Sequence, residues 1–171
     1  MTWEKFLAEG DYAVTLIRNG LRKRGINTGE SILTQFNTDE DIPVYDNLGN
    51  KIFWISVKTV FQSITDPIRQ IPPGYKGWMC GEVESKQWVN PPAVVIWYCR
   101  NTKIAWGAIT PTRPSTKWII YPDRYGTKID KRKTAATGET HYIYPSYCVP
   151  TSEIISKDEV INYIQQLSIS C

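Results

Sequence analysis

The sequence predicts an α+β, or mixed α/β, fold in which helices flank one central mixed sheet. Three observations predict it: a helical repeat of apolar residues near the N-terminus, several extended segments after it, and a second helical segment at the C-terminus. Segments in this order pack as helices against a sheet. The length of 171 residues suits one domain, so we expect residues 1–171 to form it.

The first helix is expected over residues 9–24. Apolar side chains recur there three or four positions apart, and Gly25 follows as a natural helix stop. The apolar residues of this repeat are Ala13, Leu16, Ile17 and Leu21.

Extended segments follow the first helix. Residues 31–36 are expected to form a short strand, and 41–45 and 51–60 a hairpin around the loop DNLGN. Further strands are expected over 93–99, 103–109, 116–122 and 141–149. The Pro- and Gly-rich segment 62–92 gives a weaker pattern, with a short helix possible over 82–89. Residues 124–139 are polar and basic, which predicts an exposed loop.

The last segment, SKDEVINYIQQL, has Ser156 and Glu159 at the spacing of a capping box. It therefore predicts a terminal helix.

Composition narrows the class of protein. No apolar run approaches the roughly 20 residues of a membrane span, and the N-terminus lacks a signal peptide's apolar core. We therefore expect an intracellular, cytoplasmic protein without a membrane partner. The four cysteines form no C-x-x-C pair, which favours buried small side chains over metal ligands. The single histidine, His141, is expected to be an ordinary sheet residue.

The net charge of +3 is small, but the basic residues gather in two clusters. Such clusters can contact the phosphates of DNA, although a solvated surface is the alternative for each. They consist of Arg18, Arg22, Lys23 and Arg24 in the first, and of Arg124, Lys128, Lys131, Arg132 and Lys133 in the second.

The second strand of the hairpin ends in a lysine. Side chains alternate between the two faces of a strand, which places Trp54, Ser56 and Lys58 on one face and Ile55 and Val57 on the other. A lysine at such a position must reach water or an anion.

Counting outward from the hairpin loop indicates which acid can meet this lysine. Tyr45 is expected opposite Lys51, so Asp41 is expected roughly opposite Ile55 and within about a residue of Ser56. Asp46 lies at the turn, ~23 Å along the strand from the lysine. Asp41, or its neighbours at 39 and 40, can therefore share a site with the lysine, and Asp46 cannot.

The stretches GDYAVTLIRNGLRKRG and DIPVYDNLGNKIFWISVKT resemble the core of the PD-(D/E)XK nuclease superfamily. Asp41 matches the aspartate that this family carries at a strand start, and Lys58 matches the lysine at the end of the next strand. Glu9 or Asp11 matches the family's helix acid. Ser56 stands where the family has Glu or Gln, so the pattern departs from the family there.

This resemblance covers roughly residues 8–60. It implies a restriction-endonuclease-like core over about 8–122, with a C-terminal strand and helix over 140–168. It also implies a Mg²⁺- or Mn²⁺-dependent endonuclease that hydrolyses DNA, of restriction, homing or mobile-element type. Hard cations of this kind prefer oxygen ligands and activate water for attack on phosphate.

The resemblance also implies roles for individual residues. Asp41 would be the principal metal ligand, helped by Glu9 and the carbonyl of Val57, and Lys58 would orient the attacking water. The implied catalytic residues are Asp41, Lys58, Ser56, Glu9 and Asp11.

Two other functions stay open. The serine supplies no charge, which favours a catalytically inactive nuclease fold that binds DNA or protein. An aromatic-rich β protein that binds a ligand is the second alternative, although tryptophans in strand-like segments are more often core residues. These tryptophans are Trp54, Trp97, Trp106 and Trp118. If the protein cuts both strands of DNA, a twofold homodimer is the simplest assembly.

Overall fold

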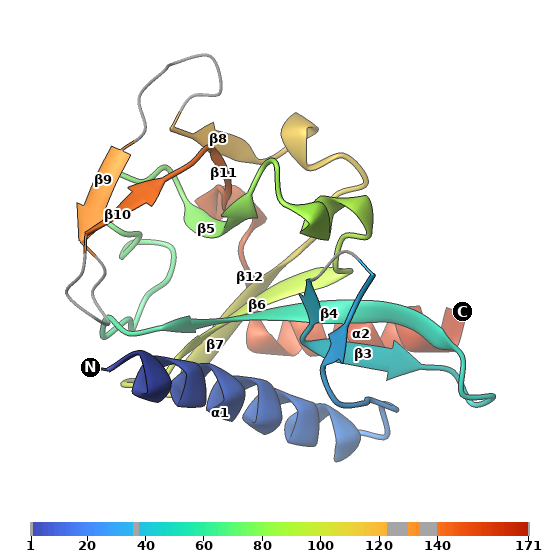
Figure 1. Ribbon diagram of the computed structural model, residues 1–171. Coiled ribbons are helices and arrows are strands. Elements are labelled where there is room, and N and C mark those ends of the chain that lie inside the picture. The colour runs from blue at the N-terminus through green and yellow to red at the C-terminus, as the bar shows by residue number, and fades with distance from the viewer. Residues whose placement is uncertain (1, 36–37, 123–129, 134–139, 171) are drawn as a thin grey trace.

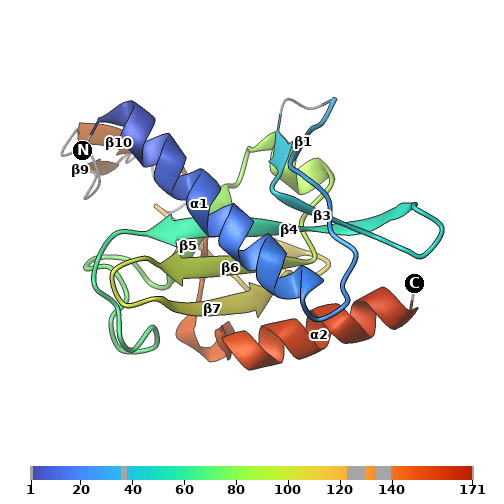
Figure 2. The same ribbon diagram turned by 90° about the horizontal axis from the view of Figure 1, so that it is seen from below.

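Two helices cover one face of a five-stranded sheet, and a smaller sheet covers the other face (Figures 1 and 2). The computed structural model describes residues 2–35, 38–122, 130–133 and 140–170. The α+β class with a mixed sheet flanked by helices, predicted from the sequence, is confirmed.

Helix α1 (Trp3–Arg22) begins six residues before the predicted start at residue 9. The Thr2 hydroxyl caps it by accepting a hydrogen bond from the Lys5 amide at 3.3 Å. Its C-terminal end is closed by Gly25, at φ +79°, and by a bond from the Ile26 amide to the Leu21 carbonyl. This pattern is the usual glycine stop, as the sequence indicates.

The main sheet has the strand order β12-β7-β6-β4-β3. The predicted hairpin forms from β3 (Ile42–Tyr45) and β4 (Lys51–Val60), which pair antiparallel. Strand β6 (Val94–Cys99) pairs with β4 in parallel, and β7 (Ile104–Ile109) pairs with β6 antiparallel. Strand β12 (Ile155–Ser156) closes the other edge, against β7.

The chain between β4 and β6 enters the smaller sheet, whose order is β5-β11-β8. Its members are β5 (Trp78–Glu82), β8 (Ile119–Tyr121) and β11 (Ser146–Val149). The predicted short helix is a 3₁₀ turn, η1 (Lys86–Val89). Further 3₁₀ turns are η2 (Pro114–Thr116) and η3 (Thr151–Glu153).

Two short hairpins lie outside these sheets. Strand β1 (Ile32–Leu33) pairs with β2 (Asp39–Glu40), and β9 (Asp130–Lys133) pairs with β10 (Thr140–Ile143). The single strand predicted over 141–149 is therefore two strands, β10 and β11, in different sheets. The rest of the predicted loop, 124–129 and 134–139, lies outside the described residues.

A separate apolar cluster fills each side of the main sheet. The cluster under the helices includes Ala13 and Leu21 of α1 with Ile55 and Val57 of β4. The cluster between the two sheets is rich in tryptophan. The prediction that the tryptophans belong to the core is confirmed, since each of the four is at most 4% exposed: Trp54, Trp97, Trp106 and Trp118.

Helix α2 (Lys157–Ser170) starts with the predicted capping box. The Ser156 amide donates to Glu159 Oε2 at 2.8 Å, and the Glu159 amide donates to Ser156 Oγ at 3.2 Å.

The cysteines of the described part of the chain, Cys80, Cys99 and Cys148, are buried free thiols, as predicted. Within the same residues, no helix has the length and apolar character needed to span a membrane.

Candidate active site at the edge of β4

The hairpin places Asp41 beside Ser56, one residue from the predicted position opposite Ile55. Ile42 pairs with Ile55, so the residue before Ile42 continues the register toward Ser56. A register shift between Val44 and Tyr45, typical of a β-bulge, accounts for the difference, because a bulge sets two residues of one strand against one of the other.

The Asp41 carboxylate accepts hydrogen bonds from β4. Oδ2 accepts from the Val57 amide at 2.7 Å and from the Ser56 hydroxyl at 3.5 Å. The Asp41 carbonyl accepts from the Ser31 hydroxyl at 2.8 Å, which holds the backbone at this point. Within the described residues Oδ1 has no hydrogen bond. One carboxylate oxygen is thus fixed against the strand, and the other is available to a ligand.

The Val57 carbonyl lies on the same edge of β4 as this carboxylate. The carbonyls of Trp54 and Val60 accept from the amides of Ala93 and Arg100, on the β6 side of the strand. Backbone groups of successive residues alternate in direction, and the N–H and C=O of one residue point the same way. The Val57 carbonyl therefore points in the same direction as its amide, toward Asp41. This part of β4 extends beyond the residues that pair with β3, which begins at Ile42.

Lys58 projects from the face of β4 that looks toward the smaller sheet. Val57 packs in the cluster under the helices and Val60 packs in the cluster between the sheets, so the even-numbered residue 58 shares the side of Val60. Its side chain is half-buried and makes no hydrogen bond or ion pair with another described residue. Its positive charge acts to lower the pKa of both Asp41 and the buried Cys80. Lys58 is therefore an uncommitted cation near the Asp41 carboxylate.

The pKa of Asp41 is raised above its ordinary value. Burial is the main cause and outweighs the Val57 hydrogen bond and the Lys58 charge, which both lower it. The nearby Asp39 carboxylate raises it further. A bound cation would act on this pKa in the opposite direction to both effects.

The structure does not bring the helix acids to this site. Helix α1 covers the opposite face of the sheet, where Val57 packs with Ala13. Glu9 forms an ion pair with Arg100, just beyond β6, and Asp11 is exposed to solvent. The family resemblance placed one of these acids with Asp41, whereas the carboxylate that acts on Asp41 here is Asp39.

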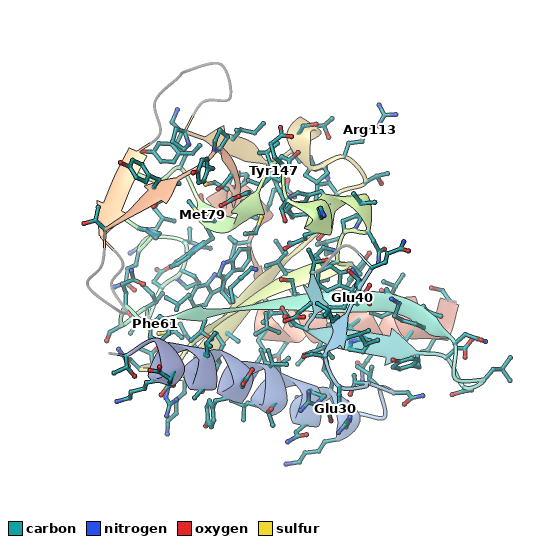
Figure 3. All side chains as sticks on the ribbon, viewed as in Figure 1. Glu30, Glu40, Phe61, Met79, Arg113 and Tyr147 are labelled. Atoms are coloured by element: carbon teal, nitrogen blue, oxygen red, sulfur yellow. The ribbon has the colours of Figure 1, made fainter. Side chains whose placement is uncertain are left out.

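The first basic cluster is partly used inside the protein. Arg18 is buried and pairs with Glu30 at 3.0 Å, beside the C-terminal end of α1 (Figure 3). Arg22 donates to the Thr28 carbonyl at 2.9 Å. These two arginines attach α1 to the segment before β1, which leaves two exposed cations for a partner, Lys23 and Arg24.

Of the second basic cluster, Arg124 and Lys128 lie outside the described residues. The other three, Lys131, Arg132 and Lys133, belong to β9.

Glu40 is a buried acid that the motif comparison did not select. Its side chain accepts from Lys51 Nζ at 2.5 Å and from Asn90 Nδ2 at 2.9 Å. Figure 3 shows it near β4, on the side away from α1. The only signal in the sequence is the acidic run of residues 39–41, which does not tell the buried acid from its neighbours.

The oxygen donors at this edge fit a magnesium ion with few protein ligands. In the described ranges, no three His, Cys, Asp or Glu side chains lie close enough to hold a metal. Mg²⁺ keeps several waters and usually takes one or two carboxylates together with substrate phosphates. Asp41 with the Val57 carbonyl, and Asp39 nearby, matches that smaller set.

Comparison with known proteins gives no match among family models, curated proteins or solved structures.

Proposed function

We propose that the protein is a Mg²⁺-dependent endonuclease that hydrolyses phosphodiester bonds of DNA. One observation carries the proposal: the Asp41 carboxylate is fixed by the Val57 amide at 2.7 Å, and the uncommitted charge of Lys58 acts on it. An acid and a backbone carbonyl thus lie at one edge of β4, and the charge of Lys58, on a face of the same strand, acts on the acid. The same residues carry the resemblance to the PD-(D/E)XK nucleases.

Each residue of this set has a distinct task. Asp41 and the Val57 carbonyl would hold Mg²⁺, with Asp39 as a second carboxylate. When bound, the ion polarises the phosphoryl group and lowers the pKa of a water. The Lys58 ammonium orients the attacking water and stabilises the negative charge that develops on the phosphate. Ser56 donates to Asp41 and adds no charge, so metal affinity is expected to be weaker than with a carboxylate there.

Lysine and arginine residues near α1 and in β9 would contact the phosphates of DNA. Lys23 and Arg24 after α1, together with the basic strand β9, are the candidates. Each phosphate contact adds about one unit to the dependence of log affinity on log salt. A twofold dimer would supply one site for each DNA strand.

Plasmid cleavage tests the proposal. Supercoiled plasmid is incubated with the protein in Mg²⁺ or Mn²⁺, and nicked and linear products are measured. Asp41→Asn and Lys58→Met are each expected to reduce the rate by at least about 100-fold, the usual effect of losing a group that stabilises transition-state charge. Asp46→Asn is the matched control, because it makes the same chemical change in the exposed turn of the same hairpin.

Retained cutting by both variants would exclude this site as the catalytic one. DNA binding that persists in EDTA, without cleavage in either metal, would favour the alternative of an inactive nuclease fold that binds DNA. Ser56 in place of a carboxylate is the observation that favours that alternative.

A further inference from the structure

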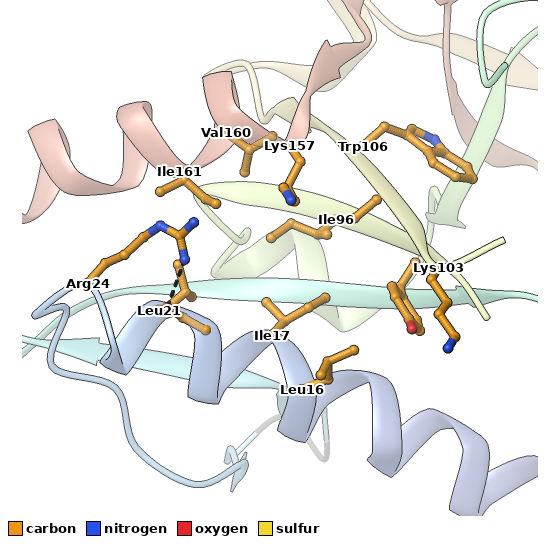
Figure 4. A pocket seen from close by; sticks show the side chains of 13 residues that line it. Leu16, Ile17, Leu21, Arg24, Ile96, Lys103, Trp106, Lys157, Val160 and Ile161 are labelled. Atoms are coloured by element: carbon orange, nitrogen blue, oxygen red, sulfur yellow. Dashed lines mark hydrogen bonds between the residues drawn. The ribbon is translucent and has the colours of Figure 1, made fainter. Parts of the chain in front are cut away.

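A cavity of about 250 Å³ lies between α1 and α2, above the face of the main sheet that the helices cover (Figure 4). It is separate from the candidate site at the edge of β4, because Asp41, Val57 and Lys58 do not line it. Its walls are mainly aliphatic and come from both helices and from β6: Leu16, Ile17, Leu21, Ile96, Val160 and Ile161.

The charged residues that line this cavity are all cations: Arg24, Lys103 and Lys157. No aspartate or glutamate is among the described residues that line it. Lys103 and Lys157 are exposed and make no ion pair with any residue of the described ranges, and Arg24 donates to the Gly20 carbonyl at 3.2 Å. In Figure 4 the amino group of Lys157 points toward Ile96, into the cavity, whereas Lys103 points away from it. Lys157 therefore offers a free positive charge at the mouth of an apolar space.

A second copy of the chain does not suit this surface. A twofold contact brings the same patch of both subunits together. It would set the cations of one subunit against those of the other, and like charges brought together at an interface are unfavourable. A ligand with one negative group and an apolar body matches both the charge and the walls.

We propose that the cavity between α1 and α2 binds a small carboxylate with an apolar tail, its carboxylate at Lys157 and its tail against the aliphatic walls. The volume of about 250 Å³ is just below the roughly 300–1,000 Å³ of pockets for drug-sized molecules, so a ligand the size of octanoate fits better than a long-chain lipid. Tail contact is the main source of affinity, and the lysine selects the charge.

Displacement of a fluorescent anion tests the proposal on the full chain. The protein is loaded with anilinonaphthalene sulfonate and titrated with butanoate, hexanoate and octanoate. Affinity is expected to rise about fourfold for each added methylene. Octylammonium, with the same tail and the opposite charge, is expected to displace the probe at least about tenfold more weakly than octanoate.

Matched variants locate the site. Lys157→Glu is expected to weaken octanoate binding at least about tenfold, whereas Lys117→Glu, the same change at an exposed lysine outside the cavity, leaves it unchanged. Ala105→Leu adds volume inside the cavity and is expected to reduce binding of every chain length. Thermal melts check that each variant is folded, and Lys157→Gln replaces Lys157→Glu if that variant does not fold.

The proposal would be overturned by no displacement with octanoate, by equal displacement with octylammonium, or by unchanged binding in the folded Lys157 and Ala105→Leu variants. Binding of the protein to phosphatidylglycerol vesicles without binding of octanoate would overturn it too, in favour of a membrane surface. These assays contain no DNA, so their outcome is separate from that of the cleavage assay.

Discussion

The Glu40 carboxylate of β2, 2% exposed, accepts a hydrogen bond at 2.5 Å from Nζ of Lys51, the first residue of β4. Its other oxygen accepts from Asn90, just before β6. Glu40, which directly precedes Asp41, thus links the first residue of β4 with the approach to β6. This linkage holds the candidate site in place without belonging to it.

Removing the lysine from this pair should destabilise the protein. Lys51→Met leaves the Glu40 charge buried with a single neutral partner, and loss of one partner of a fully buried pair costs about 3–5 kcal/mol. Because the Lys51 side chain is 35% exposed, we expect about 1–3 kcal/mol in urea unfolding. The double variant Glu40→Gln/Lys51→Met should recover part of the loss, since it leaves no unpaired charge. A double variant less stable than Lys51→Met would contradict this account.

Asp41→Asn should raise the melting temperature at neutral pH. The native pKa of Asp41 lies above its unfolded value, so the folded state binds the proton more tightly. Ionisation of this group therefore lowers stability as pH rises through that range. An asparagine can still accept from the Val57 amide and carries no charge. For a chain of this size about 2–4 °C corresponds to each 1 kcal/mol.

Thermal melts of the wild type and this variant at several pH values provide the check. The difference in melting temperature should shrink as pH falls toward the ordinary aspartate pKa of about 3.9, where the wild-type carboxylate is also neutral. A difference that does not change with pH would show that burial of the charge is not its cause.

Glu9→Gln tests whether Glu9, which matches the helix acid of the nucleases, has a structural or a catalytic role. Glu9 pairs with Arg100, whose guanidinium also lies 4.6 Å from the centre of the Tyr12 ring. We expect the variant to lose about 0.5–1.5 kcal/mol of stability and to keep most of the plasmid-cutting rate, because this acid is engaged on the other face of the sheet. A loss of cutting as large as that of Asp41→Asn, in a folded variant, would return Glu9 to the catalytic set.

Two glycines should respond in opposite ways to replacement by alanine. A Cβ at Gly107 of β7 would lie 2.6 Å from Val160 Cγ2 and 2.8 Å from the Val95 carbonyl oxygen. Gly107→Ala should therefore destabilise the protein by about 1–3 kcal/mol, as overpacking does. A Cβ at Gly10 of α1 meets no atom within 4 Å, so Gly10→Ala should stabilise the helix by up to about 1 kcal/mol. Equal effects of the two changes in urea unfolding would contradict the close contact between β7 and α2.

The parts of the fold that the sequence predicts well depend on local patterns. The hairpin of β3 and β4 follows from alternation around a Gly-containing loop, and the start of α2 follows from its capping box. Strand β5 was not predicted, because its five residues follow a Pro- and Gly-rich segment and become a strand by pairing with β11 near the end of the chain. Helix α1 was predicted to start late, since its first turn depends on the Thr2 cap rather than on apolar spacing.

The candidate site was partly predictable for the same reason. Strand counting selected Asp41 over Asp46, and the structure places Asp41 beside Ser56 and Val57. The position of Glu9 depends on which face of the sheet α1 covers, and no local pattern specifies that. The burial of Glu40 depends on Asn90, fifty residues later in the chain.

The parallel pairing of β4 with β6 has a consequence for how the chain folds. The segment between them contributes β5, whose partner β11 comes after the rest of the main sheet except β12. The main sheet and the smaller sheet are therefore interleaved along the chain, and no single cut leaves one of them whole in each fragment. In the described residues the hairpins can form early from local contacts, whereas the pairings β4–β6, β7–β12, β5–β11 and β8–β11 wait for long-range loop closure, which slows folding. The protein should unfold in one cooperative transition, with loss of both sheets together.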